Sequence, residues 1–350
     1  MENYTIYRTA ESVSPKHPDK LCDQISDAIL DAYLTNDPHA RVAVETCGGH
    51  GEIFIVGEVT ANSHEIDIPA IVTRITGDDS LKISVNLVRQ SPEIAQGVDT
   101  GGAGDQGIMI GYACDETPEL LPIEVIGARR LNQHIYSQHP YDGKTQLTIV
   151  MDPDGNHNHF YVKSIVASFQ NTPKSILQEL VDKFVAANHL RPLPNQKIEY
   201  YLNPAGDWNQ GGFSADTGLT GRKLIVDNYG PRIPIGGGAF SGKDSSKVDR
   251  SAAYMARRIA VDYLRKHHAH EVFVRLAYAI GYTEPLEHTV AVDGKTQQII
   301  HNPQLTSLGN PRDGYNLTPQ GIIKSLNLLH PIYEPTARYG HFGEGFEWDK

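Results

Sequence analysis

A glycine-rich loop with closely spaced cationic residues is the segment of this sequence best suited to chemistry. Residues 236–250 read Gly-Gly-Gly-Ala-Phe-Ser-Gly-Lys-Asp-Ser-Ser-Lys-Val-Asp-Arg. Successive glycines let a backbone approach a ligand closely, and Lys243, Lys247 and Arg250 supply donors for phosphate oxygens. From Arg222 to Arg250 six Lys or Arg residues stand against three Asp, although the whole chain has a formal net charge of −11. This basic segment in an acidic chain predicts a pocket for one small polyanion rather than an extended nucleic-acid surface.

The loop almost matches the phosphate loop of nucleotide-binding enzymes but departs from it at one position. From Gly237 to Lys243 the sequence follows G-x-x-x-x-G-K, yet Asp244 stands where that loop carries the Ser or Thr that binds magnesium. Two prolines also interrupt the approach, where a strand is required. We therefore predict a phosphate site of another design. A plainer interpretation is an S-x-x-D helix start at Ser246 and Asp249, with the lysines merely solvated.

A second polar motif, His-Pro-Asp-Lys, opens the first predicted helix. A proline and an acidic residue in a first helical turn are what helix formation alone favours. The functional interpretation places His17 and Lys20 on a phosphate and Asp19 on its magnesium ion, because hard cations prefer carboxylate oxygens. Glu45 and Glu58 lie on neighbouring predicted strands that are otherwise apolar, where a buried carboxylate would need a metal ion or a ligand ammonium as its partner.

Two glycine-rich loops add further candidates. Residues 90–107 contain Gly-Ala-Gly-Asp-Gln-Gly around Asp105, which favours a mobile lid over an ordinary surface connection. Residues 203–223 contain Asp216 and Trp208, whose indole could stack on a base or serve as a buried anchor.

The elements that must position these residues recur in one order, helix, two strands, helix, three times along the chain. The first helix has apolar positions Leu21, Ile25, Ala28, Ile29 and Ala32 and is followed by strands at 41–47 and 53–60 and a helix at 65–75. The second set has a helix at 120–136, strands at 146–151 and 160–169, and a helix at 173–187. The third has a helix at 248–266, strands at 271–280 and 288–292, and a helix at 319–329. We predict an α+β protein of three similar units, each a mixed sheet with helices on one face.

Length and composition limit the remaining possibilities. A chain of 350 residues exceeds the size of a single core, so two or three domains are expected. The first twenty residues hold no apolar run typical of a signal peptide, and no stretch approaches the apolar length of a membrane span, so we expect neither feature. Three widely spaced cysteines without a C-x-x-C pair argue against a disulfide scaffold or a zinc site. We expect a cytoplasmic protein that binds neither membrane nor nucleic acid.

The motifs together resemble those of a known family. Glu-Ser-Val followed by His-Pro-Asp-Lys, then Gly-Ala-Gly-Asp-Gln-Gly, Gly-Leu-Thr-Gly-Arg-Lys and the 236–250 loop occur in the order found in bacterial-type S-adenosylmethionine synthetases, also called methionine adenosyltransferases. The resemblance runs from about Glu11 to the Gly-His-Phe-Gly at 340–343. It implies three α+β domains related by pseudo-threefold symmetry, here at 1–100, 101–211 and 212–350. It also implies dimers that pair their sheets and share active sites, and that usually form tetramers.

The reaction implied by the resemblance joins ATP to L-methionine. The methionine sulfur attacks the ribose methylene carbon and expels triphosphate, which the same site hydrolyses to pyrophosphate and phosphate. Preplaced cations and an in-line sulfur are the main requirements of such a reaction. No nucleophilic side chain is needed, in agreement with the residues in these motifs.

The resemblance also implies roles for single residues, which fall into four groups. The catalytic residues would be His17, Arg222, Lys243 and Lys247. ATP would contact His17, Lys20, Asp142, Lys144, Trp208, Asp216, Arg222, Lys223, Ala239, Lys243 and Arg250. Methionine would contact Glu58, Gln90, Asp105, Asp216 and Lys247. Two Mg²⁺ ions would be held by Asp19 and Asp249, and a K⁺ ion by Glu45.

The chain departs from the bacterial pattern at two places. Asp207-Trp208 replaces an Arg-Phe pair whose aromatic ring lies against adenine, and the segments 90–105 and after Glu58 are shorter. We expect residues 90–101 to be mobile without ligand, since lid motion can limit turnover in such sites. Two alternatives stay open, a noncatalytic nucleotide-binding regulatory relative and a kinase or NTPase with an atypical loop that would release ADP. A purely structural role has little support.

Overall fold

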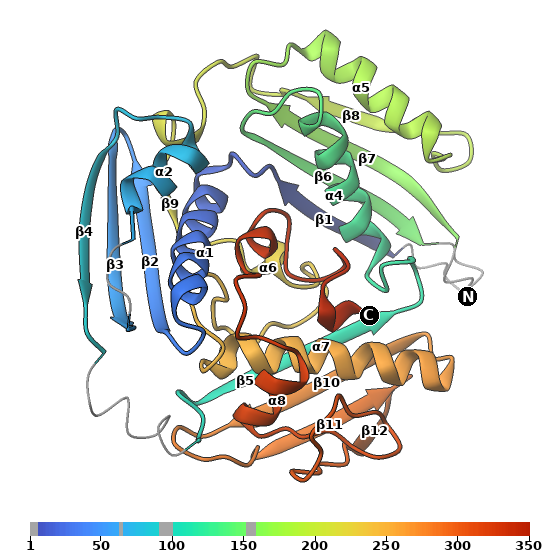
Figure 1. The fold of residues 1–350 in the computed structure, drawn as a ribbon. Helices are drawn as coiled ribbons and strands as arrows, with labels where there is room; N and C mark the ends of the chain where they lie inside the picture. The colour runs from blue at the N-terminus through green and yellow to red at the C-terminus, as the bar shows by residue number, and fades with distance from the viewer. Residues whose placement is uncertain (1–5, 63–65, 91–100, 152–158) are drawn as a thin grey trace.

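Three four-stranded sheets, each packed against helices, make up the protein (Figure 1). The computed structural model describes residues 6–62, 66–90, 101–151 and 159–350. The three α+β units surround a common centre, and each follows the same sequence of helix, antiparallel strand pair and helix. The predicted fold class is therefore confirmed.

Each unit combines one sheet with two principal helices. The first contains α1 (Pro18–Asn36), β2 (Arg41–Gly49), β3 (Glu52–Thr60), α2 (Ile68–Thr76), β4 (Lys82–Val88) and β9 (Gly218–Leu219). The second contains β1 (Tyr7–Val13), α4 (Ile123–Tyr136), β6 (Gly143–Met151), β7 (Phe160–Phe169), α5 (Lys174–Ala187) and β8 (Glu199–Leu202). The third contains β5 (Gly107–Cys114), α7 (Val248–His267), β10 (Glu271–Tyr278), β11 (Glu287–Val292), β12 (Lys295–Gln298) and α8 (Pro319–Ser325). The short α6 (Leu224–Asp227) and three 3₁₀ turns, Gly212–Ser214, Glu334–Ala337 and Glu347–Asp349, lie outside the three sheets.

One edge strand of every sheet comes from another part of the sequence. The sheet orders are β1-β6-β7-β8, β4-β3-β2-β9 and β12-β11-β10-β5. Strand β1 of the N-terminal segment thus pairs with β6, β5 of the central segment pairs with β10, and β9 of the C-terminal segment pairs with β2. We call this arrangement the cyclic strand exchange. The sheets therefore cross both predicted boundaries, and we keep 1–100, 101–211 and 212–350 only as proposed divisions of the sequence.

The predicted helices and strand pairs are all found, with small differences at their ends. Two sheets are mixed, since β3 and β4 are parallel, as are β7 and β8, whereas the third sheet is antiparallel throughout. The helix expected at 319–329 ends at Ser325. The strands β1, β4, β5, β8, β9 and β12 were not predicted. Three of them, β1, β5 and β9, pair with strands more than 100 positions away along the chain, a relation that local periodicity does not reveal.

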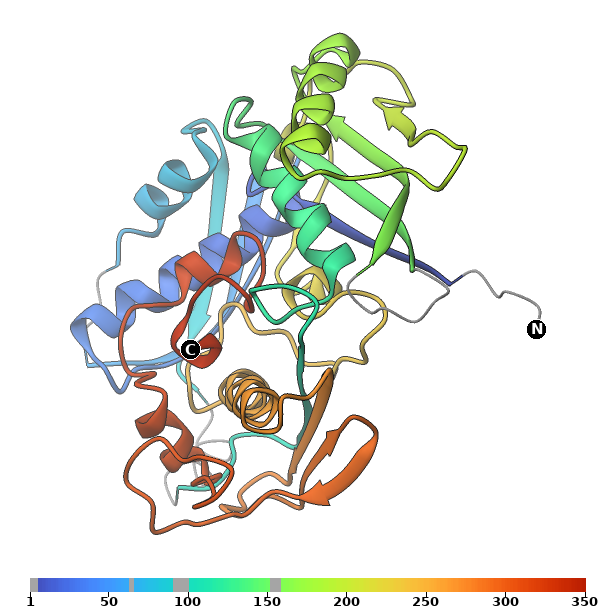
Figure 2. The same ribbon diagram turned by 90° about the vertical axis from the view of Figure 1, so that its right-hand side faces the viewer.

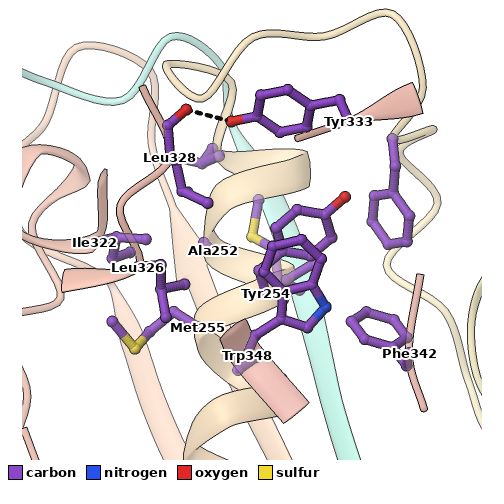
Figure 3. Packing of buried hydrophobic residues seen from close by; sticks show 14 of the residues in the cluster. Ala252, Tyr254, Met255, Ile322, Leu326, Leu328, Tyr333, Phe342 and Trp348 are labelled. Carbon is purple, nitrogen blue, oxygen red and sulfur yellow. Dashed lines mark hydrogen bonds between the residues drawn. The ribbon is translucent and has the colours of Figure 1, made fainter. Parts of the chain in front are cut away.

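The C-terminal residues lie in the middle of the molecule in both views (Figures 1 and 2). There they pack on α7, which is buried along most of its length. The rings of Tyr254 and Trp348 stack with centroids 3.7 Å apart, and the Tyr333 hydroxyl donates to the Leu328 carbonyl at 2.6 Å (Figure 3). This aromatic cluster fixes the carboxyl end of the chain against the third unit. None of the described helices combines the length and apolar character that crossing a bilayer demands.

Candidate active site

The amino end of α1 presents the first group of predicted site residues. His17 is the N-cap residue, and its Nδ1 accepts a hydrogen bond from the Asp19 backbone N–H at 3.2 Å. Pro18 follows at the first helical position, so helix formation accounts for these residue types locally. The buried carboxylate of Asp19 also accepts a hydrogen bond from the Leu219 N–H at 3.0 Å. This bond joins the helix start to the segment that carries Gly-Leu-Thr-Gly-Arg-Lys.

Two cations from that segment converge on Asp19. The Lys223 ammonium contacts Oδ2, and Arg222 Nε lies 3.3 Å from Oδ1. Burial alone would raise the pKa of Asp19, but hydrogen bonds from Lys223 and the Leu219 N–H outweigh it, so the pKa is lowered. Asp19 is therefore an ionised carboxylate held between cations.

The imidazole of His17 lies in the same group and is uncharged at neutral pH. Burial and the neighbouring Lys223 ammonium lower the pKa of His17 to about 3, against the opposing effect of Asp19. Lys144 lowers this pKa further and Asp216 raises it, so both lie within electrostatic range of the ring. The structure thus brings six of the predicted residues together around the start of α1.

The glycine-rich loop packs closely against the protein itself. A Cβ added to Gly236 would lie 1.8 Å from the Ile108 carbonyl oxygen, and one added to Gly238 would lie 2.3 Å from Asp249 Cγ. These two glycines are therefore required by neighbouring protein atoms. Lys243 Nζ lies 2.8 Å from Asp249 Oδ2 and is about four-fifths buried. A cation and a predicted metal ligand thus meet beneath the loop.

Asp244, the departure from the phosphate-loop pattern, has a structural explanation. Its buried carboxylate accepts hydrogen bonds from the Val42 N–H at 2.7 Å and the Ser246 N–H at 2.8 Å, and it contacts the Lys247 ammonium. Burial would raise the pKa of Asp244, but Lys247 outweighs it and the pKa is lowered. The helix α7 has Lys247 as its N-cap with no side-chain cap, so the S-x-x-D interpretation is wrong.

Strand β2 brings the glutamates next to this loop. Ala43 pairs with Glu58 on one side and forms an isolated bridge with Lys243 on the other. Burial raises the pKa of Glu45, while Lys243 and Lys247 act to lower it and Glu58 to raise it. Both glutamates therefore lie within reach of the cationic loop.

A pocket opens beside Asp142, whose side chain accepts a hydrogen bond from the Gly212 N–H at 2.9 Å. Its volume is about 310 Å³, and its lining includes Tyr141, Gln170 and Phe213. Burial raises the pKa of Asp142 to about 6, although the Gly212 hydrogen bond acts to lower it. Lys144 and Asp216 also affect this pKa, which links the pocket to the group around His17.

Asp207-Trp208, the second departure, is also explained in part. Asp207 Oδ1 accepts hydrogen bonds from the Lys174 N–H at 3.0 Å and from Asn203 Nδ2 at 2.8 Å, so its carboxylate fixes the start of α5. The half-buried Trp208 accepts a bond from the Asn171 N–H through its carbonyl at 2.9 Å. Stacking of the indole on a base stays a prediction.

The remaining candidates lie at the ends of loops. Gln90 follows β4 and has a buried Oε1 without a hydrogen-bond partner, and Asp105 is exposed. Ala239 faces the other cationic segment, because a Cβ on Gly221 would lie 2.5 Å from Ala239 Cβ. Most of the segment 90–101, predicted to be mobile, lies outside the described residues.

Two of the cations predicted to contact ATP point into the protein, so we do not include them in the proposed nucleotide site. Lys20 is fully buried, and its Nζ donates to Asp23 at 3.0 Å and to Asp227 at 2.7 Å. Arg250 is also fully buried and pairs with both Asp27 oxygens at 2.6 and 2.9 Å. These partners were not predicted. Four-residue spacing of Asp19, Asp23, Asp27 and Asp31 along the first helix was the available signal, since it places them on one face.

The carboxylates fit metal ions that arrive with a phosphate ligand. Among the described residues, no group of three or more His, Cys, Asp or Glu could enclose a metal ion. Mg²⁺ is usually held by one or two carboxylates together with substrate phosphates and water. Asp19 and Asp249 each offer one carboxylate beside cationic side chains, which suits that mode.

Two adjoining loops between the three α+β units carry lysines and arginines beside carboxylates, an arrangement suited to a small polyanion in a protein of the α+β class. Comparison with known sequences identifies its relatives. Models of the N-terminal, central and C-terminal domains of S-adenosylmethionine synthetase match residues 5–91, 100–208 and 210–350. The chain belongs to the S-adenosylmethionine synthetase family, and so to the methionine adenosyltransferases.

Two relatives illustrate the similarity. The S-adenosylmethionine synthase of Thermus thermophilus is 40% identical over 386 aligned positions, which cover 98% of this chain and 95% of the relative. The S-adenosylmethionine synthase of Bifidobacterium adolescentis is 41% identical over 390 positions, covering 97% and 95%. Both alignments are longer than the 350 residues of the chain, which is therefore shorter than these relatives at internal points.

Proposed function

We propose that this protein makes S-adenosylmethionine from ATP and L-methionine. The methionine sulfur attacks the ribose methylene carbon in line with the departing triphosphate, so a carbon–sulfur bond forms as the carbon–oxygen bond breaks. Water then cleaves the bound triphosphate to pyrophosphate and phosphate. Family membership and the chemistry of the site together support this assignment.

The observation that carries the proposal is the pairing of four cations with fixed carboxylates in two adjoining loops. Arg222 and Lys223 form ion pairs with Asp19. Lys243 pairs with Asp249, and Lys247 pairs with Asp244. A departing triphosphate carries about four negative charges, and preplaced cations stabilise such charge without reorganisation. The site is thus suited to a polyphosphate leaving group.

The other roles follow from position. The uncharged His17 can donate a hydrogen bond from its Nε2–H to the leaving oxygen, because its low pKa keeps the ring neutral and its Nδ1 already accepts the Asp19 backbone N–H. Asp142, Lys144, Trp208, Asp216 and Ala239 would hold the nucleotide. Glu58, Gln90, Asp105, Asp216 and Lys247 would hold methionine, whose ammonium suits the carboxylates.

Metal ions would complete the charge balance. Asp19 and Asp249 would hold two Mg²⁺ ions, which supply positive charge to the phosphate oxygens when bound. Glu45 would hold K⁺ beside the cationic loop. The paired lysines would still orient the phosphates, since they project from the same two loops.

We also propose that the active protein is a dimer, usually assembled into a tetramer, and that it works in the cytoplasm. The face of the first sheet that carries Glu45 and Glu58 also exposes Phe54 and Val56, each 46% accessible. Exposed apolar patches rimmed by polar residues are typical of protein interfaces. Pairing there would bring a second subunit against the glutamates.

The test is to incubate the purified protein with ATP, methionine, Mg²⁺ and K⁺ and to follow products by mass spectrometry and phosphorus NMR. We expect S-adenosylmethionine with equal pyrophosphate and phosphate. Accumulation of triphosphate would show that its hydrolysis, the second step, is slow. Release of ADP would instead indicate a kinase-like enzyme, and ATP binding without product would indicate a regulatory relative.

A further inference from the structure

Four aspartates form a row along one face of α1, and every one accepts backbone N–H groups from a loop. We call Asp19, Asp23, Asp27 and Asp31 the aspartate row. Asp19 accepts from the Leu219 N–H at 3.0 Å, Asp23 from the Gly221 N–H at 2.8 Å and Asp27 from the Gly242 N–H at 2.8 Å. Asp31 accepts from the Tyr333 and Glu334 N–H groups at 3.0 and 2.8 Å. Three separate segments are therefore hydrogen-bonded to successive turns of α1.

The two central positions of the row use the same device. Gly221 directly precedes Arg222, and Gly242 directly precedes Lys243. Both glycines have positive φ, 76° and 81°, and both N–H groups end on a fully buried carboxylate of α1. Each bond therefore fixes the backbone one residue before a cation that faces the proposed triphosphate site.

The surroundings leave these loops little room to shift. A Cβ on Gly218 would lie 2.2 Å from the Pro18 carbonyl oxygen, and one on Gly242 would lie 1.9 Å from the Val44 carbonyl oxygen. On the other side, Gly221 meets Ala239 of the second loop. The two loops are therefore packed against α1, against β2 and against each other. The buried aspartates set the distance between these loops and α1.

The remaining contacts of Asp23 and Asp27 direct their carboxylates. Asp23 Oδ2 accepts from Lys20 Nζ at 3.0 Å, and Asp27 receives the Arg250 guanidinium. This explains why two cations of the family motifs are buried: they hold the aspartates that hold the loops.

We propose that Asp23 and Asp27 are positioning residues, which set the location of Arg222, Lys223 and Lys243 through the Gly221 and Gly242 N–H groups and thereby determine polyphosphate affinity. The inference rests on the proposed function, because it assigns the ligand of those cations. Neither aspartate needs to touch substrate. Displacing a positioned charge by about 1 Å can cost on the order of 100-fold in such sites.

Inorganic tripolyphosphate is the probe, because it engages the cations without adenosine or methionine. We expect Asp23→Ala to weaken tripolyphosphate binding in a magnesium buffer by about 10- to 100-fold by calorimetry, with a matching rise in the KM for ATP. Asp23→Asn keeps an oxygen for the Gly221 N–H and should restore most of the affinity. The matched control is Asp31→Ala, which removes a carboxylate of the same row that holds residues 333–334 instead of a cationic loop.

Equal tripolyphosphate affinity in Asp23→Ala and the unmodified protein would overturn the inference, as would an equal loss in Asp31→Ala. If Asp23→Ala does not fold, Gly221→Ala is the second variant, because it displaces the same loop while leaving the buried charges paired. It should show the same loss of tripolyphosphate affinity, and unchanged affinity would also overturn the inference. An unmodified protein that binds tripolyphosphate yet makes no S-adenosylmethionine would refute the proposed function alone.

Discussion

At the scale of single residues, the site is a set of charges fixed in pairs before any ligand binds. Lys243 illustrates this, because its ammonium lies 2.8 Å from Asp249 and its backbone bridges β2 at Ala43. A fixed cation stabilises developing charge more effectively than a flexible one, since it needs no reorganisation during the reaction. Lys243 should therefore contribute to turnover more than to folding.

Replacing Lys243 with Met tests this role. We expect the turnover number to fall by at least ~100-fold, because the departing triphosphate loses a preplaced cation. The measurement is steady-state formation of S-adenosylmethionine, with Lys183→Met as control, since Lys183 pairs with Glu179 on the exposed side of α5. A nearly normal rate in Lys243→Met would remove this residue from the mechanism.

At the scale of elements, the sequence revealed what is local and missed what is long-range. The helix starting at Pro18 and the strand pair at 41–60 follow from periodicity, and the motifs around them located His17, Asp19 and Lys243. The direction of Lys20 and Arg250 could not be read in the same way. Their buried partners Asp227 and Asp27 are 207 and 223 positions away. A motif names a cation but does not say which side of its helix faces the ligand.

The exposed face of the first sheet carries a prediction at the same scale. Phe54 and Val56 project beside Glu45, so a charge there should prevent subunits from pairing. We expect Val56→Asp to dissociate the assembly, so that light scattering gives a lower molar mass than for the unmodified protein. Activity should fall in parallel. Leu286→Asp, at a residue 70% exposed in the third unit, serves as control. An unchanged mass for Val56→Asp would show that this face does not pair.

At the scale of the whole molecule, the carboxyl end joins all three units. His341 is fully buried, its Nδ1 lies 2.7 Å from the Tyr254 hydroxyl of α7, and its backbone N–H donates to the Asp227 carbonyl at 3.0 Å. The next residue, Phe342, accepts a hydrogen bond from Arg129 of α4 at 2.7 Å. Burial and then Arg250 lower the pKa of His341 well below 6.5.

The pH dependence of stability follows from this buried ring. Below pH 6.5 His341 is protonated in the unfolded chain but stays neutral in the folded protein. The folded state therefore loses stability on acidification and gains it as the pH rises. Between about pH 7 and 5, we expect the free energy of unfolding of His341→Gln to fall by about 2 kcal/mol less than that of the unmodified protein. Urea unfolding at each pH measures this difference. His270 has the opposite sign, because its hydrogen bond to Asp115 raises its pKa. His270→Gln should therefore lose more on acidification, and identical slopes for all three proteins would contradict the assignment.

The cyclic strand exchange also orders events during synthesis. Strand β1 emerges from the ribosome first but has no ladder until β6 follows, more than a hundred residues later. The edge of β2 stays open until β9 appears at Gly218, although its hairpin with β3 is complete by Thr60. A nascent chain therefore carries unpaired strand edges through much of its translation, and the central sheet is the first to close. Unpaired edges of this kind are prone to pair with other chains, so the risk of aggregation is highest before the carboxyl-terminal third of the chain has been made.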